Sequence, residues 1–191
     1  MAREKVAGKD QRRRNTNGHE STGPDDFYVR LWGVRGSIAC AAANIVRYGG
    51  NTSSLEVRCG DKRLMFDCGT GARYLGHALA RETPLDVDIF LSHTHFDHIC
   101  GLPFFIPFFD KRNRFRIHAG HLSPKLGVRR VLAEMMMEPL FPVPLEIFAA
   151  AIEFHDFSLG ETLHPGPGIT LRTTPLNHPN GATGYRIEYG G

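Results

Sequence analysis

Short apolar runs, broken by glycine, proline and charged residues, recur along the chain from residue 27 onward. Apolar and polar residues that alternate, or short unbroken apolar runs, are typical of strands, whereas apolar residues spaced three and four apart are typical of helices. We therefore expect strands over residues 27–32, 53–59, 63–67, 87–91, 114–119, 151–156, 169–175 and 185–189. Helices are expected over residues 72–81 and 125–137.

Residues 1–26 do not follow this pattern. They contain almost no large apolar side chains, so they cannot bury enough surface to offset the entropy lost on ordering. Six Lys or Arg residues against five Asp or Glu leave this segment nearly neutral, which disfavours a nucleic-acid-binding arm and an organelle presequence. We expect a disordered tail over residues 1–26 and one domain over residues 27–191.

Composition fits a single domain with a real core, because 41% of the 191 residues are hydrophobic. The net charge of +3 gives no strong case for attraction to nucleic acid or to a membrane. Four cysteines lack a CxxC pair, which indicates reduced thiols in a cytoplasmic protein. No apolar run is long enough to span a bilayer, and no secretory signal is expected.

Residues 92–98 read Ser-His-Thr-His-Phe-Asp-His and follow the expected strand over residues 87–91. In an extended or tightly turned backbone His93 and His95 point the same way, while Asp97 and His98 can turn toward a second point nearby. Neutral imidazole and ionised carboxylate suit zinc, manganese and iron. The loop is therefore a candidate metal site, which we weigh against an incidental solvated patch of histidines.

This loop resembles the HxHxDH motif of the metallo-beta-lactamase superfamily. Within that superfamily the chain is most similar to the phosphodiesterase-like branch, which includes phosphoribosyl cyclic phosphodiesterases and, further off, ribonuclease Z. Four other stretches carry the resemblance, at residues 33–37, 48–53, 65–71 and 177–185. The resemblance implies an α/β fold, the αββα sandwich of two sheets between helices, incomplete here in its second half.

The resemblance also implies a metal centre with two ions. His178 matches the family's third histidine and would join His93 and His95 on the first ion, while Asp97 and His98 would bind the second. Zinc is the expected cofactor, with manganese and iron as alternatives. A metal-activated hydroxide would then attack phosphorus, and Asp97 would orient it or take its proton.

Residues around this centre have expected supporting roles. Asp67 ends a strand, and we interpret it as an acid that holds the metal-bearing loop by hydrogen bonding, the alternative being an ordinary turn residue or helix cap. The Gly-rich residues 33–51 are expected to form a loop over the site. There Arg35 could pair with a phosphate, and Arg35, Ser37 and Asn51 are candidate substrate contacts.

A small cyclic or nucleotide-like phosphodiester is the expected substrate, although lactams and thioesters are cleaved by relatives with the same kind of centre. Nucleic acid is a less favoured partner, no membrane partner is expected, and a homo-oligomer is left open. His118, His121, His155 and His164 have no partner at ligand spacing, and we expect them to be structural or solvent-facing.

The family pattern is not complete in these 191 residues. A bridging aspartate and a further histidine generally follow the third histidine, and no residue after Glu188 fits either role. We expect a chain truncated at its C-terminus, the N-terminal part of a dinuclear phosphodiesterase. The alternatives are a non-catalytic metal-binding or interaction protein and a ribonuclease Z-like RNA nuclease.

Overall fold

Six strands form the larger sheet in the computed structural model, which describes residues 27–122 and 126–191. In sheet order these strands are β1 (Phe27–Gly33), β2 (Ser54–Cys59), β3 (Lys62–Phe66), β4 (Asp86–Leu91), β5 (Arg114–Ala119) and β6 (Ala151–Asp156). β1 to β3 pair antiparallel, whereas β3 to β6 pair parallel. The carboxyl ends of β3, β4 and β5 therefore meet at one edge of the sheet. The expected tail over residues 1–26 lies outside the described residues.

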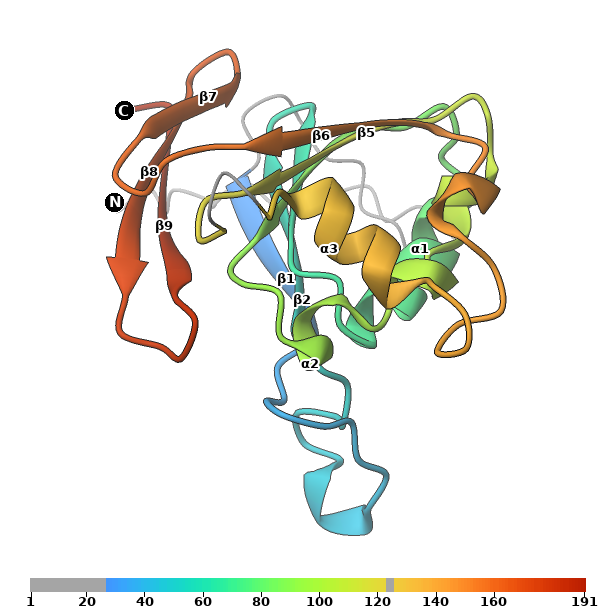
Figure 1. Cartoon of the computed structure of the whole chain (residues 1–191). Helices are drawn as coiled ribbons and strands as arrows, with labels where there is room; N and C mark the ends of the chain where they lie inside the picture. Colours follow the sequence, from blue (N-terminus) through green and yellow to red (C-terminus); the bar gives the residue numbers. More distant parts are fainter. Residues whose placement is uncertain (1–26, 123–125) are drawn as a thin grey trace, which may run out of the picture.

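Three further strands form a second, antiparallel sheet, at one side of the molecule in Figure 1. They are β7 (Thr162–Gly166), β8 (Ile169–Leu176) and β9 (Ala182–Tyr189). Ile169 and Leu171 of β8 pack against Phe66 and Phe90 of the larger sheet in a shared apolar core. β7 was not expected from the sequence, because His164 and Pro165 interrupt its apolar pattern.

Helices cover the other face of the larger sheet (Figure 1). The two longer ones are α1 (Gly71–Leu79) and α3 (Val128–Met135). Leu75, Leu79 and Leu132 of these helices are buried with Val87 and Ile89 of β4. Both expected helices are confirmed, although α1 begins one residue earlier and ends two residues earlier than expected, and α3 is shorter than the expected range of 125–137. A four-residue helix, α2 (Phe96–Ile99), and four 3₁₀ turns, η1 (Ala43–Ile45), η2 (Leu102–Phe104), η3 (Ile106–Phe109) and η4 (Leu145–Ile147), complete the elements.

The described residues thus build three of the four layers of an αββα sandwich, namely helices, the larger sheet and the smaller sheet. Two cores separate these layers, one under the helices and one between the sheets. The expected α/β fold class is confirmed. Within the described ranges, every helix is too short or too polar to cross a membrane.

Four phenylalanines lie in and between η2 and η3, and from the large area that a phenylalanine buries we expect them to pack in the core rather than to line a substrate cleft. Phe105 and Phe108 are fully buried and contact Phe115 of β5 edge to face. Phe104 and Phe109, in contrast, are 53% and 46% exposed. The expectation therefore holds for the two phenylalanines whose side chains point to the sheet.

A buried carboxylate on β4 collects charged partners from the neighbouring strands. Asp88 is 2% exposed, and its carboxylate accepts hydrogen bonds from Lys62 Nζ at 2.6 Å, Arg116 Nε at 2.9 Å and His118 Nε2 at 2.9 Å. Burial alone raises the pKa of Asp88, but the hydrogen bonds from His118, Arg116 and Lys62 outweigh burial and lower that pKa well below its usual range. The ionised carboxylate therefore holds β3, β4 and β5 together.

We expect Asp88→Asn to lower the free energy of unfolding at neutral pH by about 3 kcal/mol, because it leaves buried cations without their counter-charge. Asp86→Asn is the matched control: its side chain is 60% exposed in the same network, and we expect a loss below about 1 kcal/mol. Urea denaturation measures both.

The pH dependence gives a second check on this network. Since the folded-state pKa of Asp88 lies below the ordinary value of about 3.9, its contribution is present above about pH 4 and is lost as the pH falls further. The gap in stability between wild type and Asp88→Asn should therefore narrow in acid. A gap that stays constant below pH 4 would contradict this account.

Candidate metal centre

The loop after β4 lies where the two sheets meet. Thr183 N donates a hydrogen bond to Ser92 O at 2.7 Å, and the hydroxyl of Tyr185 donates to Leu91 O at 2.7 Å. Both donors belong to β9 of the smaller sheet. Leu91 is the last residue of β4, and Ser92 is the first residue after it. Residues 92–95 then connect β4 to α2 at the carboxyl edge of the parallel strands, a common place for ligand sites in α/β proteins.

Three histidines from two separate loops come together at this edge. The ring centroids of His93 and His95 lie 4.6 Å apart. The ring centroid of His178 lies 4.4 Å from that of His93 and 4.9 Å from that of His95. One ring nitrogen of each residue lies within 4.8 Å of the corresponding nitrogens of the other two. Three imidazoles at this spacing match the donor set of a catalytic zinc site with an open position.

His178 reaches the cluster from the turn between β8 and β9. Gly181 N donates to His178 O at 2.9 Å, and Asn180 and Gly181 both adopt positive φ, +64° and +81°. Asparagine and glycine tolerate this left-handed conformation better than other residues. The same turn places Asn180 Oδ1 3.4 Å from His95 Nε2, where the amide oxygen accepts a hydrogen bond from the ring.

Asp97 and His98 lie next to each other beside the three histidines, and their role at a second metal position stays a prediction. His98 Nε2 lies 3.4 Å from Asp97 Oδ2, and the rings of His93 and His98 are 4.0 Å apart. Asp97 Oδ2 also accepts a hydrogen bond from Ser37 N at 2.7 Å. A carboxylate oxygen and an imidazole nitrogen therefore face one position beside the three histidines.

The carboxylate of Asp67 lies beneath the loop at the end of β3. It is 4% exposed and accepts hydrogen bonds from Ser92 N at 2.8 Å, Ser53 Oγ at 2.8 Å and His98 Nδ1 at 2.7 Å. An ionised carboxylate only accepts, so His98 Nδ1 carries a proton, and in the neutral form of the ring Nε2 keeps its lone pair for a cation. These contacts match the supporting role expected for Asp67.

Ser92 links the carboxylate of Asp67 to the ring of His93. Its hydroxyl donates its single proton to Asp67, and its oxygen lies 3.1 Å from His93 Nδ1. His93 Nδ1–H is therefore the donor in that contact, which leaves His93 Nε2 with a free lone pair. One carboxylate thus fixes the tautomers of two histidines in the cluster.

Burial and charge separate the pKa values of these two histidines. Burial, together with the neighbouring His98, His95 and His178, lowers the pKa of His93 to about 4, so its ring is neutral at neutral pH. Burial alone also lowers the pKa of His98, but the hydrogen bond and the negative charge of Asp67 outweigh it and raise that pKa. A neutral ring is the form that binds a metal.

The loop over residues 34–50 runs away from α2 and carries η1 at its far end (Figure 1). Ser37 reaches the centre through its backbone amide, with φ at +69°. Arg35 is half-buried, and its Nε donates to Ile38 O at 3.0 Å. Asn51 closes the base of the loop, because its carbonyl accepts from Arg35 N and its Oδ1 from Thr70 Oγ1. Substrate contact by these three residues stays a prediction.

Sequence reasoning missed two residues beside the cluster. Asn180 is one, and His121 is the other: His121 Nε2 lies 3.1 Å from Thr94 Oγ1, between His93 and His95 in sequence. A usable signal existed for both, since each follows a strand whose carboxyl end lies at this edge.

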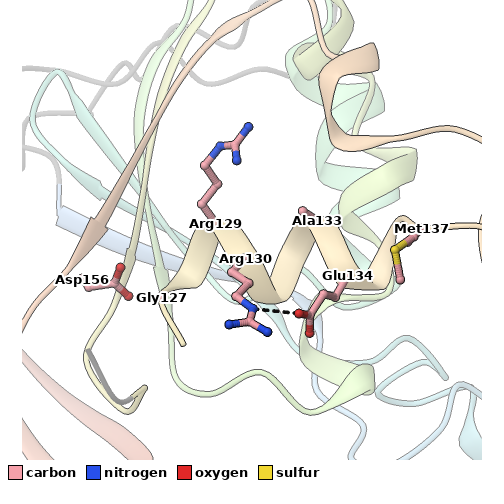
Figure 2. Close-up of a pocket in the computed structure, with 7 residues that line it drawn as sticks. All are labelled: Gly127, Arg129, Arg130, Ala133, Glu134, Met137 and Asp156. Carbon is pink, nitrogen blue, oxygen red and sulfur yellow. Dashed lines mark hydrogen bonds and ion pairs between the residues drawn. The ribbon is translucent and has the colours of Figure 1, made fainter. Parts of the chain in front are cut away.

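A surface pocket of about 420 Å³ lies elsewhere, over α3, and Figure 2 shows the residues that line it, among them Arg129, Arg130 and Glu134.

A mixed α/β protein with a histidine-rich candidate metal site between two sheets is the class that this geometry defines. Residues 47–171 match the family model of the metallo-beta-lactamase superfamily, and the chain belongs to that superfamily. The matched segment includes residues 92–98 and ends before His178.

Relatives by sequence agree with the expected branch of the superfamily. The chain is 30% identical over 137 residues to ribonuclease Z of Porphyromonas gingivalis, which covers 71% of this chain and 43% of that protein. It is 33% identical over 131 residues to ribonuclease Z of Bradyrhizobium diazoefficiens, with 67% and 40% covered. The chain therefore spans less than half the length of these relatives.

Solved structures agree with the fold. A metallo-beta-lactamase fold protein of Bacillus subtilis superposes with a TM-score of 0.60 and 23% identity, covering 87% of this chain and 60% of that one. The short form of human tRNase Z gives a TM-score of 0.57 and 17% identity, covering 85% and 65%.

We expect Asp67→Asn to raise the dissociation constant for Zn²⁺ by about 10- to 100-fold, because the amide no longer fixes the ring tautomers of His98 and His93. Competition with a chromophoric chelator measures this constant. Ser53→Ala is the control, since Ser53 donates to the same carboxylate without touching a histidine of the cluster, and its effect should be clearly smaller. Equal effects of the two substitutions would contradict the orienting role.

Proposed function

We propose that the protein is a metal-dependent hydrolase that cleaves phosphodiesters at the histidine cluster. The observation that carries this proposal is the convergence of His93, His95 and His178, with one ring nitrogen from each within 4.8 Å of the others. Clustered titratable side chains with shifted pKa values are typical of functional sites, and three imidazoles are a common protein ligand set of a catalytic zinc ion.

The residues present suit two cations. His93, His95 and His178 would hold the first, and Asp97 with His98 would supply ligands to the second. Zinc suits this set of imidazoles and one carboxylate, and manganese and iron accept the same donors. Divalent cations bound there would lower the pKa of a water molecule and neutralise negative charge on a phosphoryl group.

Asp97 is the candidate catalytic carboxylate. Its Oδ2 faces His98 Nε2 and accepts a hydrogen bond from the Ser37 amide, and this contact fixes the direction of the other carboxylate oxygen, Oδ1. From there Asp97 would orient the attacking water or take its proton. Arg35 uses one N–H on its own loop, so its remaining N–H groups are left to pair with a phosphate, as a guanidinium does in bidentate contacts.

The relatives favour phosphodiesters over lactams and thioesters, and RNA is a second candidate substrate. Ribonuclease Z of two bacteria is among the proteins that this chain resembles at 30% identity or more. The net charge of +3 gives no separate sign of RNA binding, so we rank a small cyclic or nucleotide-like phosphodiester first. Four free cysteines support a reducing, cytoplasmic location.

We expect the purified chain to bind about one Zn²⁺ tightly, because one position has three histidines. Zinc-dependent hydrolysis of bis(p-nitrophenyl) phosphate should be slow but measurable. His95→Ala should abolish tight zinc binding and reduce hydrolysis at least about 100-fold. Elemental analysis after gel filtration measures the metal, and release of p-nitrophenol measures the rate.

His77→Ala is the matched control, since His77 lies in α1 on the exposed side of that helix and should change neither value. Cleavage of an RNA oligonucleotide in preference to the small ester would shift the assignment to RNA. Tight zinc binding without hydrolysis of either substrate would overturn the catalytic proposal and favour a metal-binding or interaction protein.

A further inference from the structure

His121 lies between the two loops that carry the histidine cluster. β5 ends at Ala119, which pairs with Leu91 at the end of β4, so His121 emerges beside residues 92–95. On its other side is the turn that follows His178: a side chain at Gly181 would lie 3.8 Å from His121 O and 3.9 Å from its Cβ. His121 therefore contacts the loop that carries His93 and His95 and lies beside the turn that follows His178.

The two nitrogens of the His121 ring have different surroundings. Nε2 lies 3.1 Å from the hydroxyl oxygen of Thr94, the residue between His93 and His95. Nδ1 is buried and, among the described residues, has no hydrogen-bond partner. An N–H on the unpartnered side would be costly, so Nε2 carries the proton and donates it to Thr94.

We propose that His121 is a positioning residue, which fixes the backbone between His93 and His95 through the hydroxyl of Thr94 and so sets the spacing of these two imidazoles for a cation. This inference rests on the metal centre of the proposed function. His121 is not one of the described residues whose ligand atoms lie within 4.8 Å of one another, and its ring centre lies 6.5 Å from that of His93, edge to face.

A role in filling space and a role in positioning predict different substitutions. If the ring only fills space, an apolar residue of similar size should replace it best. If the hydrogen bond of Nε2–H matters, a side chain with an N–H at the position of Nε2 should suffice, since Nδ1 has no hydrogen-bond partner within residues 27–122 and 126–191. The amide of glutamine reaches about as far as Nε2, whereas that of asparagine reaches only as far as Nδ1.

The test uses Co²⁺ alone as the probe, with the dissociation constant and the visible absorption band followed by titration. We expect His121→Leu and His121→Asn to raise the dissociation constant by about 10- to 100-fold and to change the band. His121→Gln should stay within about threefold of the wild type. His77→Asn, on the exposed side of α1, is the control and should leave the dissociation constant and the absorption band unchanged.

A double-mutant cycle with Thr94→Val decides whether the two residues act as one unit. Thr94→Val should weaken Co²⁺ binding as His121→Asn does. The dissociation constant of the double variant should lie within about threefold of that of the weaker-binding single variant. Thermal unfolding of the metal-free proteins identifies any variant that fails to fold. If His121→Asn fails to fold, Thr94→Val alone decides: an unchanged Co²⁺ affinity of that variant overturns the inference.

Other outcomes also decide against it. Equal affinities of His121→Asn and His121→Gln, a better result for His121→Leu than for His121→Gln, or additive effects in the cycle would each overturn the positioning role while leaving the proposed function intact. A wild-type chain that binds no Co²⁺ would overturn the proposed function and this inference together.

Discussion

The buried carboxylate of Asp67 is the interaction on which the arrangement of the site depends. A single side chain at the end of β3 accepts hydrogen bonds from Ser53, from the backbone and hydroxyl of Ser92, and from His98. It therefore joins the base of the loop that leads into β2, the end of β4 and the start of α2. A buried carboxylate is costly unless its oxygens are satisfied, so the donors that surround it can be arranged in few ways.

The backbone conformation of Asp67 fits this role. Its φ is +60°, a left-handed conformation that aspartate adopts more readily than most residues other than glycine and asparagine. Its own amide donates to Phe90 O on β4, so the backbone turns sharply while it stays attached to the neighbouring strand. The turn places the carboxylate under the histidines, where it accepts the hydrogen bonds of Ser92 and His98.

The second sheet completes the site from the other side. Tyr185 and Thr183 of β9 bond to the carbonyls of Leu91 and Ser92, and Tyr185 also contacts the rings of Phe66 and Phe90. Packing between the sheets thus fixes where β9 begins, and the turn before β9 carries His178. The burial that excludes water from this junction also keeps His93 neutral at neutral pH.

The sequence by itself determined the strands over residues 27–191 with the exception of β7, the two longer helices, and the grouping of His93, His95, Asp97 and His98 in one short segment after β4. These features are local: period-two patterns, helical spacing and residues a few positions apart depend on short-range geometry. The family motif added His178. Only the tertiary structure decided that Ser37 meets Asp97, that Asp67 fixes two ring tautomers, and that His121 and Asn180 lie beside the cluster. Each of these contacts joins residues more than 25 positions apart or depends on which nitrogen of a ring faces which partner. Such contacts follow from the order of the strands in the larger sheet and, for Asn180, from its packing against the smaller sheet, rather than from any pattern along the chain.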